Sequence, residues 1–308
     1  MTLLKPKRIF KGQRIGIFSP SDPIYPRRIP FILEGLRILQ TWGFKPDDIN
    51  EDDFNRWAEL RSPLERAGEF NSLVVNKTNS ALLATWGGKN VSDILQLVNY
   101  DLLKEHRKVI FGSSDIAVLL NAITAKTNLL TFYGPNVLGK LNQTCESGLP
   151  LISDTIQIPF EINLNGSFGP VAVVSGRTIG HLVGGSLGTF TLGLSGTNYI
   201  PNFDKMIFFF ESGSLDLFRI RQHLRHLELT GFLDKVTGVI VGSMTKIEDT
   251  KKLDLLLSEV FSQRSCPVIR CDAFGHGYFY NPMIPIGPVA ELRTNPCRLT
   301  IFEALTIE

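Results

Sequence analysis

The chain has 308 residues, 43% hydrophobic and 20% charged, which suits one large domain or two medium ones with ordinary cores. Its 32 basic and 30 acidic residues give a net charge of +2, too small for the basic surface typical of a nucleic-acid or membrane binder. Four cysteines are too few for a disulfide scaffold, and neither a secretory signal nor an 18-residue apolar span is present. We therefore expect a cytoplasmic protein that binds neither nucleic-acid polymers nor membranes.

The first half of the sequence alternates strand and helix patterns. Residues 13–18 form a short β-rich run, and apolar residues at helical spacing over 30–42 predict a helix that ends at Gly43. Helices are also predicted over 62–72, 91–104 and 115–126, and strands over 81–86, 108–111 and 129–133. Strands separated by helices predict βαβ units and a mainly parallel sheet.

The pattern changes after Gly134 and Pro135. Residues 138–170 are rich in turn formers, and from Val171 the sequence predicts mostly strands, because its glycines are too dense for a long helix. Strands are predicted over 205–210, 236–241, 267–270 and 284–303, and helices over 215–229 and 253–261. We therefore expect an α/β domain over 1–140, a linker over 141–170 and a β-rich domain over 171–308, with an active cleft between the domains.

A serine stands where a predicted strand turns into a predicted helix, in the segment Gly112-Ser113-Ser114-Asp115-Ile116. Free backbone N–H groups at the start of a helix can stabilise an oxyanion, which acyl transfer requires. A serine there is equally well explained as a helix cap. The segment also differs from the G-x-S-x-G elbow of α/β-hydrolases, because Ile116 replaces the second glycine.

Three other segments can carry chemistry. Gly87 and Gly88 end a predicted strand, where exposed N–H groups can approach a ligand, although a plain turn explains them as well. Glu211 follows a run of apolar residues at the end of a strand and can orient an imidazole or simply face solvent. His276 lies between two glycines and can act as a general base, although a lone loop histidine is commoner.

In order and content, these segments resemble the serine LD-carboxypeptidase family (peptidase family S66), which includes murein tetrapeptide carboxypeptidases and microcin C immunity proteins. Gly112-Ser113-Ser114-Asp115 matches the family's G-Y-S-D nucleophile segment. Further matches lie at 17–21, 62–67, 87–88, 99–103, 131–135, 184–185, 196–197, 210–211, 275–276 and 285–287. The residues at 100–101, 125–127 and 131–135 resemble the microcin-immunity branch of the family more closely than the murein branch. The resemblance implies a Rossmann-like N-terminal domain with a parallel sheet, a β-rich C-terminal domain, and a homodimer.

The resemblance also implies the site. Ser114 matches the nucleophile, Glu211 the triad acid and His276 the triad base. The oxyanion donors map to the backbone N–H of Asp115 and of the double glycine Gly87-Gly88, with Gly87 favoured. No metal or organic cofactor is required by this chemistry.

The predicted function is that of a serine peptidase or amidase acting on a small peptide or a peptidyl or aminoacyl nucleotide of the microcin C type. The alternatives are a murein tetrapeptide LD-carboxypeptidase and an inactive relative that only binds a small ligand. Three departures from the family affect the expected substrate: Ser113 replaces the usual Tyr, Ser186 stands where Asn is frequent, and Ile220 stands where Asp is common.

Overall fold

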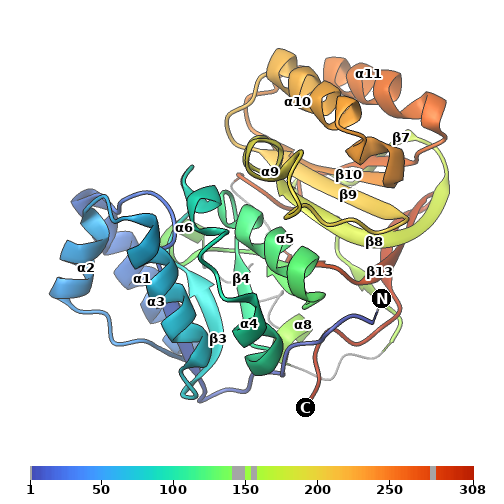
Figure 1. The fold of residues 1–308 in the computed structure, drawn as a ribbon. Helices are drawn as coiled ribbons and strands as arrows, with labels where there is room; N and C mark the ends of the chain where they lie inside the picture. Colours follow the sequence, from blue (N-terminus) through green and yellow to red (C-terminus); the bar gives the residue numbers. More distant parts are fainter. Residues whose placement is uncertain (1, 141–149, 154–157, 278–281) are drawn as a thin grey trace.

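The computed structural model describes residues 2–140, 150–153, 158–277 and 282–308, and its strands form two sheets (Figure 1). The first sheet has the order β12-β5-β4-β3-β1-β2, and every pair in it is parallel except β12 with β5. The strands are β1 (Arg14–Phe18), β2 (Lys45–Pro46), β3 (Asn79–Ala84), β4 (Val109–Gly112), β5 (Thr131–Tyr133) and β12 (Ile284–Ile286). The predicted parallel sheet is confirmed.

The first half of the chain forms α1 (Ile29–Thr41), α2 (Glu51–Ala58), α3 (Pro63–Val75), α4 (Tyr100–His106), α5 (Ile116–Thr127) and α6 (Val137–Lys140). Helices α1, α3 and α5 pack against strands of the first sheet. Ser62 begins α3 as the sequence predicts, because its hydroxyl accepts from the backbone N–H of Glu65 in a capping box. Helix α5 is buried on almost all sides, since it lies between the two sheets in Figure 1.

The expectation of one helix over 91–104 is wrong. The segment forms a short 3-10 helix, η2 (Val91–Ile94), followed by the separate helix α4. Asn99 causes the interruption, because its side chain accepts from the N–H of Leu102 and so starts a new helix at Tyr100. Helix α2 has no counterpart in the prediction, although Asn50 and Asp53 form a capping box at its start.

The second sheet has the order β6-β14-β13-β8-β9-β10-β11-β7. Its strands are β6 (Phe160–Ile162), β7 (Val171–Val174), β8 (Arg177–Ser186), β9 (Met206–Ser212), β10 (Val236–Met244), β11 (Val268–Arg270), β13 (Val289–Thr294) and β14 (Cys297–Ile301). Strands β8 to β11 are parallel, and α10 (Leu217–Leu229) and α11 (Thr250–Phe261) cover one face (Figure 1). The predicted fold class, a parallel α/β part with a β-rich second part, is confirmed.

A helix in the second half corrects the expectation that glycine-rich residues there form only strands and turns. Residues Leu187–Leu194 form α9, which includes Gly188 and Gly193. A Cβ on Gly193 would lie 3.0 Å from the side chain of Val118 on α5. Glycine is therefore used here to bring two helices close together.

The two sheets are joined through α5. The buried side chain of Asn121 donates to the carbonyl of Gly184 on β8 at 2.8 Å and accepts from its N–H at 3.3 Å. Strand β12, from the C-terminal part of the chain, completes the first sheet, and Lys7 forms a bridge with Ile307. The predicted linker 141–170 lies partly outside the described residues, and β6 falls within it, so the boundaries 1–140 and 171–308 stay predictions. No helix in the described part of the chain is long and apolar enough to cross a membrane.

Candidate active site

Ser114 lies in a strained turn between β4 and α5. Its φ of 61° falls in the left-handed region that non-glycine residues rarely occupy. The turn is held by Asn136, whose side chain accepts from the N–H of Ser113 at 2.9 Å. Strain at a side chain that faces a cavity is typical of functional sites. The alternative of Ser114 as a simple helix cap loses support, because the cap residue of α5 is Asp115.

Glu211 and His276 form a hydrogen-bonded pair. Residue 211 lies in β9, and its side chain is fully buried, which rules out the solvent-exposed alternative. Its Oε2 lies 2.6 Å from Nδ1 of His276 and accepts from the His276 backbone N–H at 2.9 Å. Gly275 permits this approach, because its φ is 104° and a Cβ there would lie 2.5 Å from Cγ of Glu211.

Tyr133 connects Glu211 to the Ser114 turn. Its hydroxyl donates to Oε1 of Glu211 at 2.7 Å and accepts from the backbone N–H of Ser114 at 3.2 Å. Burial, together with the nearby Glu211 carboxylate, raises the pKa of Tyr133 well above its usual value. The hydroxyl therefore stays protonated, and the direction of both hydrogen bonds is fixed.

Ser114 and His276 both line one cavity of about 850 Å³. Other lining residues follow strands of both sheets, among them Gly88 and Ser212. Parallel strands commonly present functional groups at their carboxyl ends, and β3, β4 and β9 end at this cavity. Residues that are far apart in the sequence therefore share one site, as the predicted cleft between the domains requires.

Of the predicted oxyanion donors, Gly87 and Asp115 lie beside Ser114. A Cβ built on Gly87 would lie 2.8 Å from Cβ of Ser114 and 3.3 Å from the backbone N of Asp115. The N–H groups of Gly87, Gly88 and Asp115 have no hydrogen-bond acceptor among the residues that the structure describes. Unpaired N–H groups next to a serine hydroxyl are the arrangement that binds an oxyanion.

The sequence reasoning missed the cations of this cavity. Arg28, Lys89 and Arg219 line it, and none of them makes an ion pair within the described ranges. The guanidinium carbon of Arg28 lies 3.6 Å from the centre of the Trp86 ring, and burial lowers the pKa of this arginine. The pattern that identifies α10 gives no sign that Arg219 faces the cavity.

His223, which lies on α10, also lines this cavity. Burial is the main cause that lowers its pKa, assisted by His226 and Arg219. His223 is therefore neutral near pH 7 and adds hydrogen-bonding capacity rather than charge. No group of three metal-binding side chains occurs in the part of the chain that the structure describes.

Comparison with known proteins assigns the family. A family model for the LD-carboxypeptidase N-terminal domain matches residues 15–134, and one for the LD-carboxypeptidase C-terminal domain matches residues 179–292. The chain belongs to the LD-carboxypeptidase family. The predicted resemblance is thereby confirmed.

Two curated relatives and one solved structure illustrate the range of this LD-carboxypeptidase family. The microcin C7 self-immunity protein MccF of Escherichia coli is 29% identical over 90% of this chain and 89% of its own length. The probable murein peptide carboxypeptidase of Bacillus subtilis is 26% identical over 94% of this chain and 92% of its own. A structure of MccF with aspartyl sulfamoyl adenosine has a TM-score of 0.85 at 24% identity, covering 99% of this chain and all of that one.

Replacing Tyr133 with Phe is expected to lower the kcat for substrate hydrolysis about tenfold and to lower the free energy of unfolding by about 2 kcal/mol or more. The change leaves the N–H of Ser114 and one oxygen of the buried Glu211 without a partner, and such losses cost about 1–3 kcal/mol each. Steady-state kinetics and thermal unfolding measure the two effects. Tyr100→Phe is the control, because its hydroxyl donates to the Leu95 carbonyl, and it should leave kcat unchanged. An unaltered kcat in Tyr133→Phe would contradict a role in holding the Ser114 turn.

Proposed function

We propose that this member of the LD-carboxypeptidase family is a serine peptidase or amidase that uses Ser114, His276 and Glu211. The observation that carries the proposal is the buried Glu211–His276 pair, which lies at the same cavity as the strained Ser114. A carboxylate can only accept a hydrogen bond, so Nδ1 of His276 carries a proton. In this tautomer Nε2 is the unprotonated ring nitrogen, which can accept the proton of the serine hydroxyl.

These positions support the following reaction. Ser114 Oγ attacks the substrate carbonyl as His276 accepts its proton, and Glu211 stabilises the imidazolium that forms. The oxyanion of the tetrahedral intermediate accepts hydrogen bonds from the N–H of Asp115 and from that of Gly87 or Gly88. His276 then returns the proton to the leaving amine. Water hydrolyses the acyl-enzyme by the same route in reverse, which regenerates the serine.

The cavity favours a small anionic substrate. Three cations line it, Arg28, Lys89 and Arg219, against the two carboxylates of Asp22 and Asp115. Both carboxylates already accept hydrogen bonds from neighbouring loops. The three cations are therefore the charged groups available to contact a ligand. An acidic aminoacyl nucleotide fits this charge, and MccF has been solved with aspartyl sulfamoyl adenosine.

We therefore propose a substrate of the microcin C type of conjugate. The terminal carboxylate of a murein tetrapeptide also fits the charge of the cavity, so the two substrates must be compared directly.

Hydrolysis of two substrates by the purified protein tests this proposal. Aspartyl sulfamoyl adenosine and a murein tetrapeptide with a terminal D-alanine are incubated separately, and the released products are quantified by mass spectrometry. We expect release of sulfamoyl adenosine at a kcat/KM at least about tenfold above that for D-alanine release, a difference of about 1.4 kcal/mol in transition-state binding. Faster release of D-alanine would assign the protein to murein recycling. Binding without cleavage of either substrate would identify an inactive ligand-binding relative.

Arg219→Gln is expected to raise KM for aspartyl sulfamoyl adenosine about tenfold and to leave kcat nearly unchanged. The loss of one charge-assisted hydrogen bond to the substrate costs about 1.5–3 kcal/mol, and it affects ground state and transition state alike. Arg221→Gln is the matched control on the same helix, because Arg221 is exposed and pairs with Glu259 instead. Equal KM values for the two variants would contradict an anion-binding role for Arg219.

We also propose that the protein works in the cytoplasm, as its composition suggests, and that it is a homodimer, as the family resemblance implies. Light scattering coupled to size-exclusion chromatography should give twice the monomer mass of 34.4 kDa. A monomer at micromolar concentration would contradict this part of the proposal.

A further inference from the structure

The side chain of Asp115 bonds to loops outside helix α5, although Asp115 stands at the start of that helix. Asp115 is the N-cap residue of α5, yet its carboxylate makes no capping hydrogen bond to that helix. It is buried, with only 2% of the residue exposed, and it points toward two other loops. Burial raises the pKa of Asp115, because it disfavours the charged carboxylate, and the hydrogen bonds from Ser21 and Val91 oppose this effect. The contacts that it does make indicate what the carboxylate is for.

Asp115 joins three loops at the ends of adjacent strands. Its Oδ2 accepts from the hydroxyl of Ser21, in the loop after β1, at 2.5 Å. The same oxygen accepts from the N–H of Val91, in the segment after β3, at 2.9 Å. The hydroxyl of Ser21 in turn accepts from the N–H of Asn90 at 3.3 Å. The Asp115 carboxylate therefore connects the loop after β1, which contains Ser21, with the segment after β3, which contains Val91.

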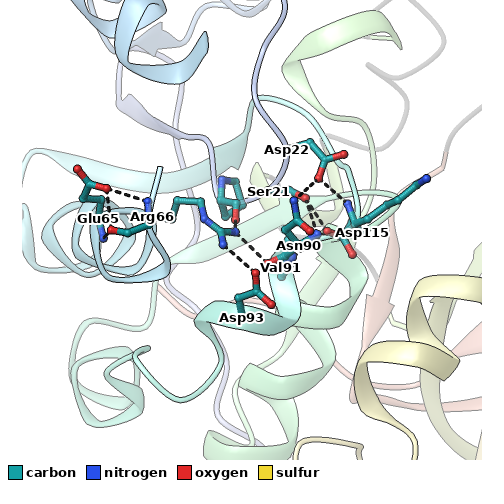
Figure 2. A network of polar contacts seen from close by, with 11 residues as sticks. Ser21, Asp22, Glu65, Arg66, Asn90, Val91, Asp93 and Asp115 are labelled. Atoms are coloured by element: carbon teal, nitrogen blue, oxygen red, sulfur yellow. Dashed lines mark hydrogen bonds and ion pairs between the residues drawn. The ribbon is translucent and has the colours of Figure 1, made fainter. Parts of the chain in front are cut away.

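A second carboxylate, Asp22, and an arginine, Arg66, also form hydrogen bonds with the same segment (Figure 2). Asp22 accepts from the N–H of Lys89 at 3.0 Å and from the side chain of Asn90 at 2.8 Å. Arg66, which is buried, donates to the carbonyls of Pro20 and Asn90. Within 89–91, therefore, each residue has at least one backbone group bonded to this network.

The segment held in this way carries the glycines beside Ser114. A Cβ on Gly88 would lie 2.5 Å from Cγ of Asp22, so Gly88 is packed directly against the network, and Gly87 is packed against Ser114. One expected oxyanion donor is the backbone N–H of Asp115 itself, and the other is on Gly87 or Gly88. The distance between these donors depends on how residues 87–91 are placed relative to Asp115.

We propose that the Asp115 side chain, acting through Ser21 and Val91, is a positioning residue that fixes the two halves of the oxyanion hole relative to each other. This inference rests on the proposed serine mechanism. The mechanism uses only the backbone N–H of Asp115, and the inference adds a role for its side chain. The Asp115 carboxylate acts through its neighbours and touches none of the reacting atoms. Its loss should therefore affect the transition state, where the oxyanion exists, more than it affects substrate binding.

The test compares Asp115→Ala and Ser21→Ala with wild type in their reaction with a small alkyl fluorophosphonate. The adduct on serine carries an oxygen in the oxyanion position, so its rate of formation depends on the placement of the donors. We expect the maximal inactivation rate to fall about 10- to 100-fold in Asp115→Ala and less in Ser21→Ala, with the probe's dissociation constant within about threefold of wild type. Hydrogen exchange at the amides of 87–91 should become faster in both variants. The double variant should lose less than the product of the single losses, because the two side chains share one hydrogen bond.

Asp47→Ala is the matched control, because Asp47 is a partly buried carboxylate that, like Asp115, accepts from a backbone N–H group, in this case that of Ile17 in the first sheet. It should lose stability and leave both the inactivation rate and the exchange of 87–91 unchanged.

Four outcomes would overturn the inference. An Asp115→Ala variant that reacts at the wild-type rate, or whose loss appears only in probe binding, would do so while the serine mechanism stands. Unaltered exchange at 87–91 in Ser21→Ala would do the same, and this milder variant keeps the test decisive if Asp115→Ala folds poorly. A wild-type protein that never reacts with the probe would overturn the serine mechanism and this inference with it.

Discussion

Ser114→Ala is expected to lower kcat at least about 10⁴-fold for any substrate that the wild type cleaves, while substrate binding is retained. The alanine removes the only atom that forms the acyl-enzyme bond, and the residual rate comes from binding and from the oxyanion donors. The strained φ of 61° makes the variant no harder to fold, because serine and alanine meet the same steric restriction there. Single-turnover kinetics by mass spectrometry measure the loss, and calorimetry measures binding.

Ser113→Ala is the control for this experiment, because Ser113 is in the same turn but is held through its backbone by Asn136. Although the sequence suggested that Ser113 affects the substrate, it is not among the residues that line the cavity. The variant should keep kcat within about threefold of wild type, as expected for a substitution that leaves the reacting atoms in place. A Ser114→Ala variant with unchanged turnover, or a greater loss in Ser113→Ala, would show that the nucleophile is wrongly assigned.

Glu211→Gln is expected to lower kcat about 10³- to 10⁴-fold with a small change in KM. The carboxylate accepts from Nδ1 and N–H of His276 and from the Tyr133 hydroxyl. An amide replaces one of its two acceptor oxygens with a donor. Either the tyrosine hydroxyl then faces an N–H group, or the imidazole adopts the tautomer in which Nε2 carries the proton and cannot act as a base.

Glu291→Gln tests whether any buried glutamate of the second sheet would give the same effect. Glu291 is buried in β13, pairs with Arg177 and Arg293, and is not among the residues that line the cavity of Ser114. This variant should lose stability and keep its kcat. If Glu211→Gln retained full turnover, the imidazole would need another orienting group, and the triad would be contradicted.

Most of the fold could be predicted because its elements have strong local patterns. Strand β9 is a continuous apolar run, and α3 begins with a Ser-Pro pair and a capping box, so each is visible in a short window. The incorrect predictions of helices and strands lie where a single residue acts against the pattern of its segment. Asn99 interrupts the helix expected over 91–104. Gly193 was expected in a strand or turn but lies in α9, where the lack of a side chain lets this helix approach α5 closely.

The candidate site could be named from the sequence only through the family resemblance. Ser114, Glu211 and His276 each had an ordinary alternative, and nothing in their spacing showed that they meet. The structure joins Glu211 to His276 and has Ser114 on the same cavity, but it also brings in Tyr133, whose role depends on a contact across 78 residues. The cavity's arginines were missed for the same reason, since the direction of a surface arginine depends on tertiary packing.

Mapping the site of covalent modification by diisopropyl fluorophosphate tests the central claim most directly. After incubation at neutral pH, digestion and mass spectrometry should locate a single phosphoryl adduct on the peptide that contains Ser114, and hydrolytic activity should fall in proportion. The adduct should be absent from Ser114→Ala and form far more slowly in His276→Ala, because the hydroxyl then lacks its base. Loss of activity with the adduct on another residue, or full activity with Ser114 modified, would contradict the assignment of Ser114 as the nucleophile.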